Sequence, residues 1–350
     1  MKKQRIIEAA GIVSKKLNRF QAGDVLAIVN GVASRQYVSR VLSEMAAGGI
    51  LVSSGSKRYT YYALPVNADF LVDKETRTLQ NRDLKEHLVY EELFSKAEVA
   101  RRLNDNASSI IDFAFSEMLN NAIEHSGSEQ IKVELYRDKQ SLVFTIRDFG
   151  LGVYETIKSR YKLASDLEAI QELLKGKTTT APKAHSGEGI FFTSKAVDEF
   201  ILESFGTTLR IDNTIDDVFV NTRQRQLRGT KVTVRLSGKT KRHLNDVFRA
   251  YYSDPESFAF DKTLILIKLY TMGTVYVSRS QARRVLQNIE KRFKVVVLDF
   301  DKVPSVGQAF ADEIFRVFAK RHPEITIECA NMTESVEFMI KRAKNTAQMN

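Results

Sequence analysis

The first part of the chain alternates apolar and polar positions with the period of a helix. Near the N-terminus, apolar side chains recur three or four residues apart, as expected for one buried helix face. These residues are Ile6, Ile7, Ala10 and Val13. The pattern predicts a second short helix over Ala22 to Val29. A third helix should begin at Ser34, a good N-cap, and end near Ala47, before Gly48 and Gly49.

Two short strands are predicted after the third helix. Ile50 to Val52 and Tyr59 to Leu64 have strand character, and residues 53–58 between them form a polar loop. Helices followed by a hairpin resemble the winged helix-turn-helix fold, which would occupy residues 1–65. Met1 to Leu64 contains ten Lys and Arg against three Asp and Glu. We therefore expect this part to bind DNA, although winged helices also serve as protein-docking modules.

The winged-helix resemblance implies where DNA would be contacted. The third helix would be the recognition helix, with Arg35, Gln36 and Arg40 available for a groove. Lys57 and Arg58 would meet phosphates from the wing loop.

A long, largely apolar helix is predicted in the middle of the chain, over residues 110–125 (IIDFAFSEMLNNAIEH). Glu117 and Asn121 fall on the same helical stripe as Ile110 and Ala114, where apolar residues are expected. An unpartnered buried carboxylate costs on the order of several kcal/mol, so these polar groups need partners. Either a structural hydrogen-bond network or a metal–nucleotide site would supply them.

Short glycine motifs follow this helix at wide intervals. A predicted strand, Leu142 to Ile146, leads into a DFGLG turn, and another predicted strand, Lys231 to Leu236, follows a Gly-Thr pair. Between them lie a charged helical stretch over 155–174 and a polar segment over 176–186. The motif residues are Asp148, Gly150, Gly152, Gly187, Gly189, Gly229 and Thr230. Each motif alone is a common turn or helix entry.

In this order and at these distances, the motifs closely resemble the gyrase/histidine-kinase (GHKL) ATPase superfamily. The stretch from Glu117 to His125 is similar to its N box, and the later motifs are similar to its two glycine boxes and closing Gly-Thr. The resemblance covers about half of the chain. It implies a two-layer α/β domain over residues 66–238 that binds ATP with Mg²⁺.

The resemblance implies a role for each polar motif residue. Asn121 would offer an amide oxygen to Mg²⁺, which prefers hard oxygen ligands. Glu117 would orient or deprotonate the attacking water or hydroxyl. Asp148 would accept a hydrogen bond from the adenine amino group, and Thr230 would help to hold the adenine edge. Asn120 is an alternative to Asn121.

The glycines would act through the backbone. Gly150 and Gly152 would let the chain approach the nucleotide. Gly187 and Gly189 would expose backbone N–H groups to phosphate oxygens at a helix N-terminus. The segment from about Tyr154 to Ser186 would be the ATP lid.

From about Phe258 the pattern alternates between strands and helices, as in small α/β layer folds. Residues 278–283 and 296–315 resemble a STAS domain, the fold of anti-sigma-factor antagonists, so a STAS-like domain is expected over 255–345. Antagonists present a phosphorylatable Ser where this chain has Gly307-Gln308-Ala309. The departure favours a unit that docks a regulatory protein or dimerises over the usual phosphorylation switch.

Composition narrows the setting. The 350 residues, 43% of them hydrophobic, indicate a multidomain α/β protein of two or three domains. Cys329 is the single cysteine, which fits a reducing compartment. No apolar run approaches transmembrane length and no signal peptide is recognised, so we expect a cytoplasmic protein without membrane contact. The net charge of +10 permits contact with nucleic acid or acidic protein.

These domains together predict an ATP-dependent regulator. In the first hypothesis, Mg-ATP bound to the GHKL domain controls DNA or protein-partner binding. In the second, the chain is an anti-sigma-type serine/threonine protein kinase with Glu117 as the base. In the third, it is a DNA-binding transcriptional regulator with a non-catalytic nucleotide site. By analogy with the family, a homodimer is expected.

Overall fold

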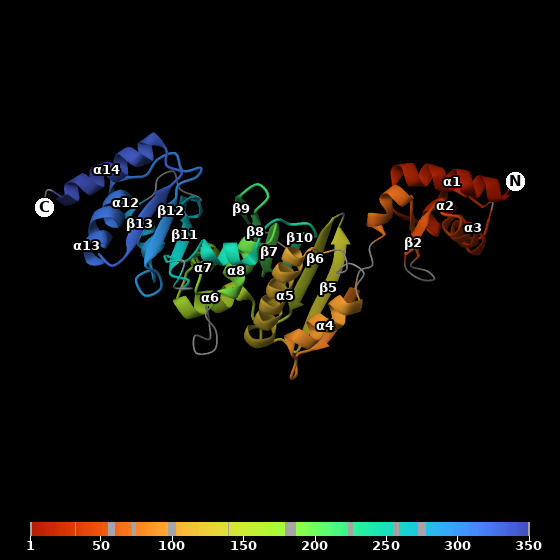
Figure 1. The fold of residues 1–350 in the computed structure, drawn as a ribbon, viewed down its shortest axis with the longest axis horizontal. Helices are drawn as coiled ribbons and strands as arrows, with labels where there is room; N and C mark the ends of the chain where they lie inside the picture. Colours follow the sequence, from red (N-terminus) through yellow and green to blue (C-terminus); the bar gives the residue numbers. More distant parts are fainter. Residues whose placement is uncertain are drawn as a thin grey trace.

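Apolar residues gather in two separate cores. One core spans Ile6 to Tyr62, and the other spans Val89 to Ala343. In Figure 1 the N-terminal unit accordingly stands apart from the rest of the chain. The structure is a computed structural model, and it describes residues 2–31, 33–54, 60–71, 75–96, 103–138, 140–178, 187–222, 227–254, 256, 259–271 and 278–348.

In its described residues, the N-terminal unit has three helices and a three-stranded antiparallel sheet of order β1-β3-β2. Its elements are α1 (Lys2–Lys16), β1 (Phe20–Gln21), α2 (Ala22–Val29), α3 (Arg35–Ala47), β2 (Val52–Ser54) and β3 (Tyr61–Ala63). The expected N-cap is present, because Ser34 Oγ accepts a hydrogen bond from Tyr37 N–H at 3.3 Å. Strand β2 begins later than predicted, and β1 is too short to show a period-two pattern. Lys57 and Arg58 lie outside the described residues.

The described part of the middle unit contains a seven-stranded antiparallel sheet. Its strands are β4 (Glu75–Gln80), β5 (Gln130–Asp138), β6 (Ser141–Asp148), β7 (Glu199–Ser204), β8 (Thr207–Asp212), β9 (Asp217–Thr222) and β10 (Thr230–Ser237). Their order is β4-β5-β6-β10-β7-β8-β9, so the late strand β10 lies between β6 and β7. This insertion brings the Gly-Thr pair at the start of β10 beside Asp148 at the end of β6.

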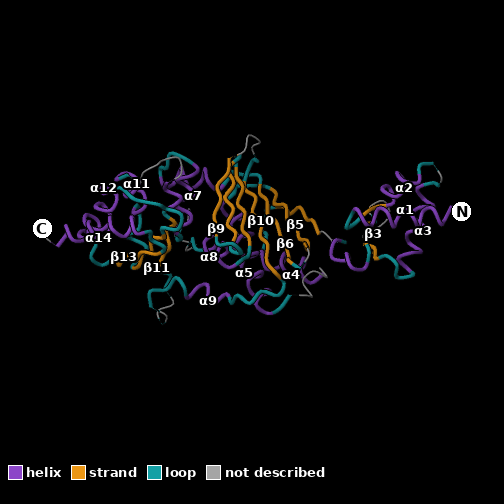
Figure 2. Tube along the Cα trace, turned by 90° about the horizontal axis from the view of Figure 1, so that it is seen from above, coloured by secondary structure: helices purple, strands orange, loops and turns teal. Residues whose placement is uncertain are grey.

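Helices cover one face of this sheet. The long α5 (Asp105–His125) begins after Asn104, a side-chain N-cap, and packs its apolar stripe against the strands. Helices α4 (Glu86–Lys96), α8 (Gly189–Ala196) and α9 (Leu244–Arg249) lie on the same side, as Figure 2 shows. The unit is therefore built of two layers, one of strands and one of helices.

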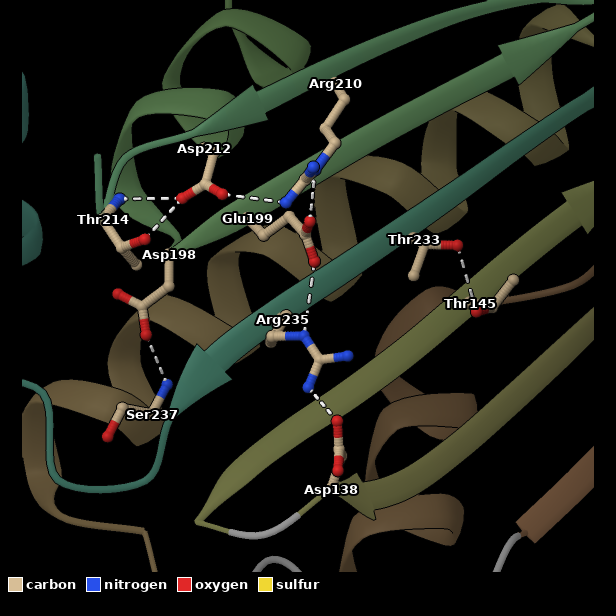
Figure 3. Close-up of polar contacts among 10 residues, drawn as sticks. All are labelled: Asp138, Thr145, Asp198, Glu199, Arg210, Asp212, Thr214, Thr233, Arg235 and Ser237. Carbon is tan, nitrogen blue, oxygen red and sulfur yellow. Dashed lines mark hydrogen bonds and ion pairs between the residues drawn. The ribbon is translucent and has the colours of Figure 1, made fainter. Parts of the chain in front are cut away.

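The opposite face of the sheet is polar and carries a ladder of ion pairs (Figure 3). Glu199 on β7 joins Arg210 on β8 at 2.6 Å and Arg235 on β10 at 3.3 Å. Arg235 also pairs with Asp138 on β5, and Arg210 reaches Asp212 at 2.9 Å. Partly exposed pairs each contribute at most about 1 kcal/mol. The ladder thus adds cross-strand contacts and makes this face polar. Its contribution to the stability of the fold is small.

The charged stretch after the DFGLG turn forms two helices, α6 (Val153–Tyr161) and α7 (Asp166–Lys175). Helix α6 ends at Lys162, which has a left-handed φ of +54°. Helix α7 is buried from Ala169 to Lys175, so this part of the predicted lid is not an exposed flap. Residues 179–186 of the predicted lid lie outside the described residues.

The C-terminal unit has a three-stranded parallel sheet in its described residues. Strands β11 (Lys262–Leu266), β12 (Val295–Asp299) and β13 (Thr326–Ala330) are arranged in that order. Its helices are α10 (Lys268–Thr271), α11 (Arg279–Leu286), α12 (Gln308–Asp312), the π-helical η4 (Glu313–Phe318), α13 (Ala319–Arg321) and α14 (Glu334–Gln348). The apolar run Thr263 to Leu269 predicts a longer first strand, but β11 ends at Leu266. The chain turns into α10 there, and Tyr270 N–H donates to Ile267 O at 2.9 Å.

The middle and C-terminal units share one core. Phe260, just before β11, lies next to Phe191 and Phe192 of α8, with ring centroids 4.9 and 4.7 Å away. Phe293 extends the cluster at 5.5 Å from Phe260. Aromatic pairs at these distances are favourable beyond the area that they bury. The N-terminal unit has its own core instead and leads into the 3-10 helix η2 (Pro65–Phe70).

A membrane-spanning helix needs about 20 consecutive, mostly apolar residues. Among the described residues, no helix combines that length with that composition.

The two cores predict two thermal unfolding transitions. Ile6→Ala should lower the midpoint of one transition only and Leu298→Ala that of the other, each costing about 2–5 kcal/mol because a fully buried side chain is truncated. Phe144→Ala, in the large sheet, should lower the same transition as Leu298→Ala, because both residues belong to the shared core. Differential scanning calorimetry measures these shifts. Separate transitions for Phe144→Ala and Leu298→Ala would contradict a shared core.

Candidate functional site

A pocket opens between helix α5, the sheet and the first turn of α8. Seven of the eight residues predicted to contact nucleotide or metal line it: Glu117, Asn121, Asp148, Gly152, Gly187, Gly189 and Thr230. Gly150, the eighth, does not line it. The fold therefore brings residues from widely separated segments of the chain to one cavity.

Apolar side chains complete the wall of the pocket. Met118, Ile157, Leu173, Leu202 and Val232 all line it. An apolar wall with a few polar groups is typical of a small-molecule site. These residues are not predicted from the sequence, because isolated apolar positions on helices and strands look like any other core residue.

Helix α8 approaches α5 directly over Glu117. A Cβ at Gly189 would lie 2.0 Å from Glu117 Oε2, so no larger residue fits there without displacing the carboxylate. Glycine thus lets the N-terminus of α8 come into contact with Glu117. The first N–H groups of a helix lack intrahelical partners and favour a bound anion.

Asn121 lies one turn after Glu117 on the same face of α5. Its Nδ2 atom is buried and has no hydrogen-bond partner among the described residues. An unpaired buried polar group costs about 1–3 kcal/mol. A side-chain amide can present either its nitrogen or its oxygen after rotation. The unpaired amide therefore fits a ligand or metal in the pocket.

Asp148 is fixed at the end of β6 by backbone donors. Its Oδ1 accepts hydrogen bonds from Gly150 N–H at 2.9 Å and Thr230 N–H at 3.1 Å. Thr230 Oγ1 in turn accepts from Val153 N–H at 2.9 Å. Only 5% of Asp148 is exposed, and this burial raises the pKa of its carboxyl group. The result is a buried acceptor with a defined direction.

Gly150 and Gly152 each have a protein neighbour that excludes a side chain. A Cβ at Gly150 would lie 1.8 Å from Ser126 O, and one at Gly152 would lie 2.5 Å from Ser204 Oγ. The family resemblance implies that both glycines also let the backbone approach a nucleotide. Close packing within the protein already explains why both positions need glycine.

Carboxylates outnumber cations in the wall of the pocket. Glu117, Glu124, Asp148 and Glu188 line it, whereas no Lys or Arg is found among the described lining residues. A polyphosphate alone would meet like charge here. Mg²⁺ prefers oxygen ligands and would offset that charge. The residues present therefore fit a nucleotide that enters with a divalent cation.

Residues 89–212 match the family model of the histidine kinase-like ATPase domain. Such a domain implies ATP binding. The match ends before β10, yet the structure places Thr230 of that strand in the same pocket. Residues 281–337 match a STAS-like domain of unknown function. No curated protein matches the chain.

The predicted DNA-contacting residues of the N-terminal unit lie on the outer face of α3. Arg35, Gln36 and Arg40 are exposed. Arg40 pairs with Glu44 one turn later, at 3.2 Å between Nε and Oε1. An exposed i,i+4 pair is worth only about 0.3–0.5 kcal/mol, so Arg40 can readily exchange this partner for another anion.

Asp148→Asn tests how the negative charge of Asp148 affects the free energy of unfolding, because asparagine has a similar shape but cannot ionise. Asparagine keeps an oxygen that can accept both backbone bonds. Because burial raises the pKa of Asp148, its ionised form lowers wild-type stability. This loss is fully present above the raised pKa and disappears as the pH falls towards the ordinary aspartate value of about 3.9.

We therefore expect Asp148→Asn to be at least as stable as the wild type at about pH 7, with the difference shrinking as the pH approaches about 4. Urea unfolding at a series of pH values measures this. A variant that is clearly less stable at neutral pH would show that the ionised carboxylate supports the fold.

Proposed function

We propose that the chain is an ATP-binding regulator in which Mg-ATP in the pocket between α5 and α8 controls binding of DNA or of a protein partner. The observation that carries this proposal is the meeting of Glu117, Asn121 and Asp148 in one pocket. All three belong to the segment that matches a histidine kinase-like ATPase domain. The units on either side of this segment would bind the partners.

Asp148 would select adenine. Its carboxylate would accept a hydrogen bond from the exocyclic amino group of the base, which favours adenine over guanine. Burial and two backbone bonds support this role, because they fix the direction of the acceptor. Thr230 would border the adenine edge, and Leu202 and Val232 would cover part of the base.

Asn121 would hold Mg²⁺ through its amide oxygen. When bound, the cation would neutralise charge on the phosphate oxygens. Glu117, one turn away, would orient or deprotonate the attacking water or hydroxyl. The backbone N–H groups of Gly187 and Gly189, at the start of α8, would donate hydrogen bonds to phosphate oxygens.

The response to ATP would pass to the flanking units. The exposed face of α3 suits DNA, and the STAS-like region suits a regulatory protein. We propose domain limits of 1–65, 66–238 and 255–345 for the winged helix, the ATPase domain and the STAS-like domain. The last two would act together, because they share a core around Phe260.

A serine/threonine kinase of the anti-sigma type is the second candidate function. It is favoured by the presence of a STAS-like match beside the ATPase match in one chain. Helix α12 begins with Gln308, so the start of this helix lacks the phosphorylatable serine that antagonists of this type present there. Such a kinase would therefore act on another polypeptide. Transfer of label from γ-labelled ATP to a protein, rather than to water, would favour this candidate.

Calorimetry with Mg-ATP is the first test of the site. The wild type should bind. Asp148→Asn should weaken binding by about 1–3 kcal/mol, because an NH2 donor would replace the carboxylate oxygen that accepts from the adenine amino group. Asn121→Ala should remove the dependence on Mg²⁺. Asn120→Ala is the matched control, because Asn120 is the neighbouring amide in the same pocket. A wild type that binds no ATP would overturn the proposal.

The double variant Arg35→Ala, Arg40→Ala should weaken binding to a mixed-sequence DNA duplex. Each lost phosphate contact should reduce the slope of log affinity against log salt by about 1. The control is Lys320→Ala, Arg321→Ala, which removes the same charge from exposed positions of the C-terminal unit. Fluorescence anisotropy with and without Mg-ATP measures both. Equal affinities for the two double variants would exclude α3 as the DNA site.

A further inference from the structure

Helix α7 faces the pocket on one side and the C-terminal unit on the other. Leu173 lines the pocket, and so does Thr178, just beyond the helix. Thr178 is tied to α7, because its Oγ1 donates to Glu172 O at 2.9 Å. The helix also contains three polar residues that are almost completely buried, Gln171, Glu172 and Lys175. Buried polar groups require partners, and here these come largely from the C-terminal unit.

Two arginines of the C-terminal unit hold α7 directly. Arg292 Nη1 forms an ion pair with Glu172 Oε1 at 2.7 Å, without the geometry of a hydrogen bond. Arg284 Nη2 donates to Gln171 Oε1 at 2.6 Å, and Gln171 Nε2 donates to Leu269 O at 2.8 Å. The charge-assisted bond from Arg284 is stronger than a bond between neutral groups. The outer side of α7 is therefore fixed in position by residues about a hundred positions later in the chain.

Lys175 adds further bonds between α7 and the C-terminal unit. Its Nζ donates to the backbone oxygens of Arg284 and Gln287, both at 2.9 Å. Its own carbonyl accepts from Thr263 Oγ1 at 2.6 Å. The side chains of Lys175 and Glu172 are each only 3% exposed. Removing one partner of a buried charge is strongly unfavourable, so α7 cannot shift without breaking bonds to the C-terminal unit.

A second contact reaches the end of α7. A Cβ at Gly176 would lie 2.6 Å from the ring of Phe260, so the two are tightly packed. Lys177 Nζ donates to Arg292 O at 3.1 Å and lies 5.4 Å from the centre of the Phe260 ring. Phe260 also packs against Phe191 of α8, whose first turn borders the pocket. Phe260 of the C-terminal unit thus contacts both the end of α7 and α8, which form two walls of the pocket.

We propose that Arg284 and Arg292 are positioning residues of the nucleotide site. They hold α7 so that Leu173 and Thr178 form the pocket wall, which makes the STAS-like region a structural part of the site. Both arginines lie outside the segment that matches the ATPase domain. The inference rests on the proposed binding of Mg-ATP. Because coupling is reciprocal, Mg-ATP that binds better with α7 in place also stabilises the packing of the C-terminal unit.

Arg284→Met and Arg283→Met form a matched pair on helix α11. Arg284 reaches α7, whereas its neighbour Arg283 reaches Glu313 within the C-terminal unit at 2.9 Å. Each change removes one guanidinium, half-buried at Arg284 and exposed at Arg283. Calorimetry should give a Kd for Mg-ATP roughly five- to tenfold higher for Arg284→Met than for the wild type, and an unchanged Kd for Arg283→Met.

Hydrogen exchange separates positioning from a loss of stability. In the wild type and in Arg283→Met, Mg-ATP should slow amide exchange in α11, because binding stabilises the coupled packing. In Arg284→Met this slowing should be lost. If the methionine variant does not fold, Arg284→Lys keeps the charge without the guanidinium geometry and permits the same comparison.

Equal Kd values for the matched pair, or exchange in α11 that does not respond to Mg-ATP, would overturn the proposal while leaving the nucleotide site standing. A wild type that binds no Mg-ATP would refute the nucleotide site itself, and this inference with it.

Discussion

The approach of α8 to α5 at Glu117 is the contact on which the middle of the molecule depends. The backbone of α8 comes so close to this carboxylate that any side chain at Gly189 would displace it. From that fixed point, α8 carries Phe191 and Phe192 into the aromatic cluster around Phe260. The same turn of α8 therefore borders the pocket through Gly189 and contacts the C-terminal unit through Phe191 and Phe192.

Polar groups make this junction specific. An aromatic cluster alone tolerates small changes in orientation, because apolar packing is not directional. The hydrogen bonds of Gln171, Glu172 and Lys175 to the C-terminal unit are directional, and another orientation of that unit would leave these groups without partners. The N-terminal unit belongs to a separate core and shares no apolar cluster with the other two. The C-terminal unit is therefore held to the middle unit by a shared core and by directional bonds, whereas the N-terminal unit has a core of its own.

Local features of the fold could be predicted from the sequence, whereas contacts between residues far apart in the chain could not. Helix α3 has an N-cap at Ser34 that marks its start, and Glu117 and Asn121 interrupt an otherwise apolar stripe that draws attention to α5. Strands β4, β5 and β7 to β9 are not predicted, because short alternating segments indicate a sheet only once their neighbours are known. Glu172 and Lys175 look like solvated surface residues. Their partners lie about a hundred positions later, beyond the reach of any local pattern.

The acidic wall of the pocket has a consequence for what the protein would sense. Its described lining contains four carboxylates and neither Lys nor Arg. Such a wall would discriminate by electrostatics as well as by shape, so a bare nucleotide and its metal complex would be different ligands. Occupancy would then follow the complexed fraction of the nucleotide pool rather than its total. A chelator that competes for the metal would empty the site even while the nucleotide itself remained abundant.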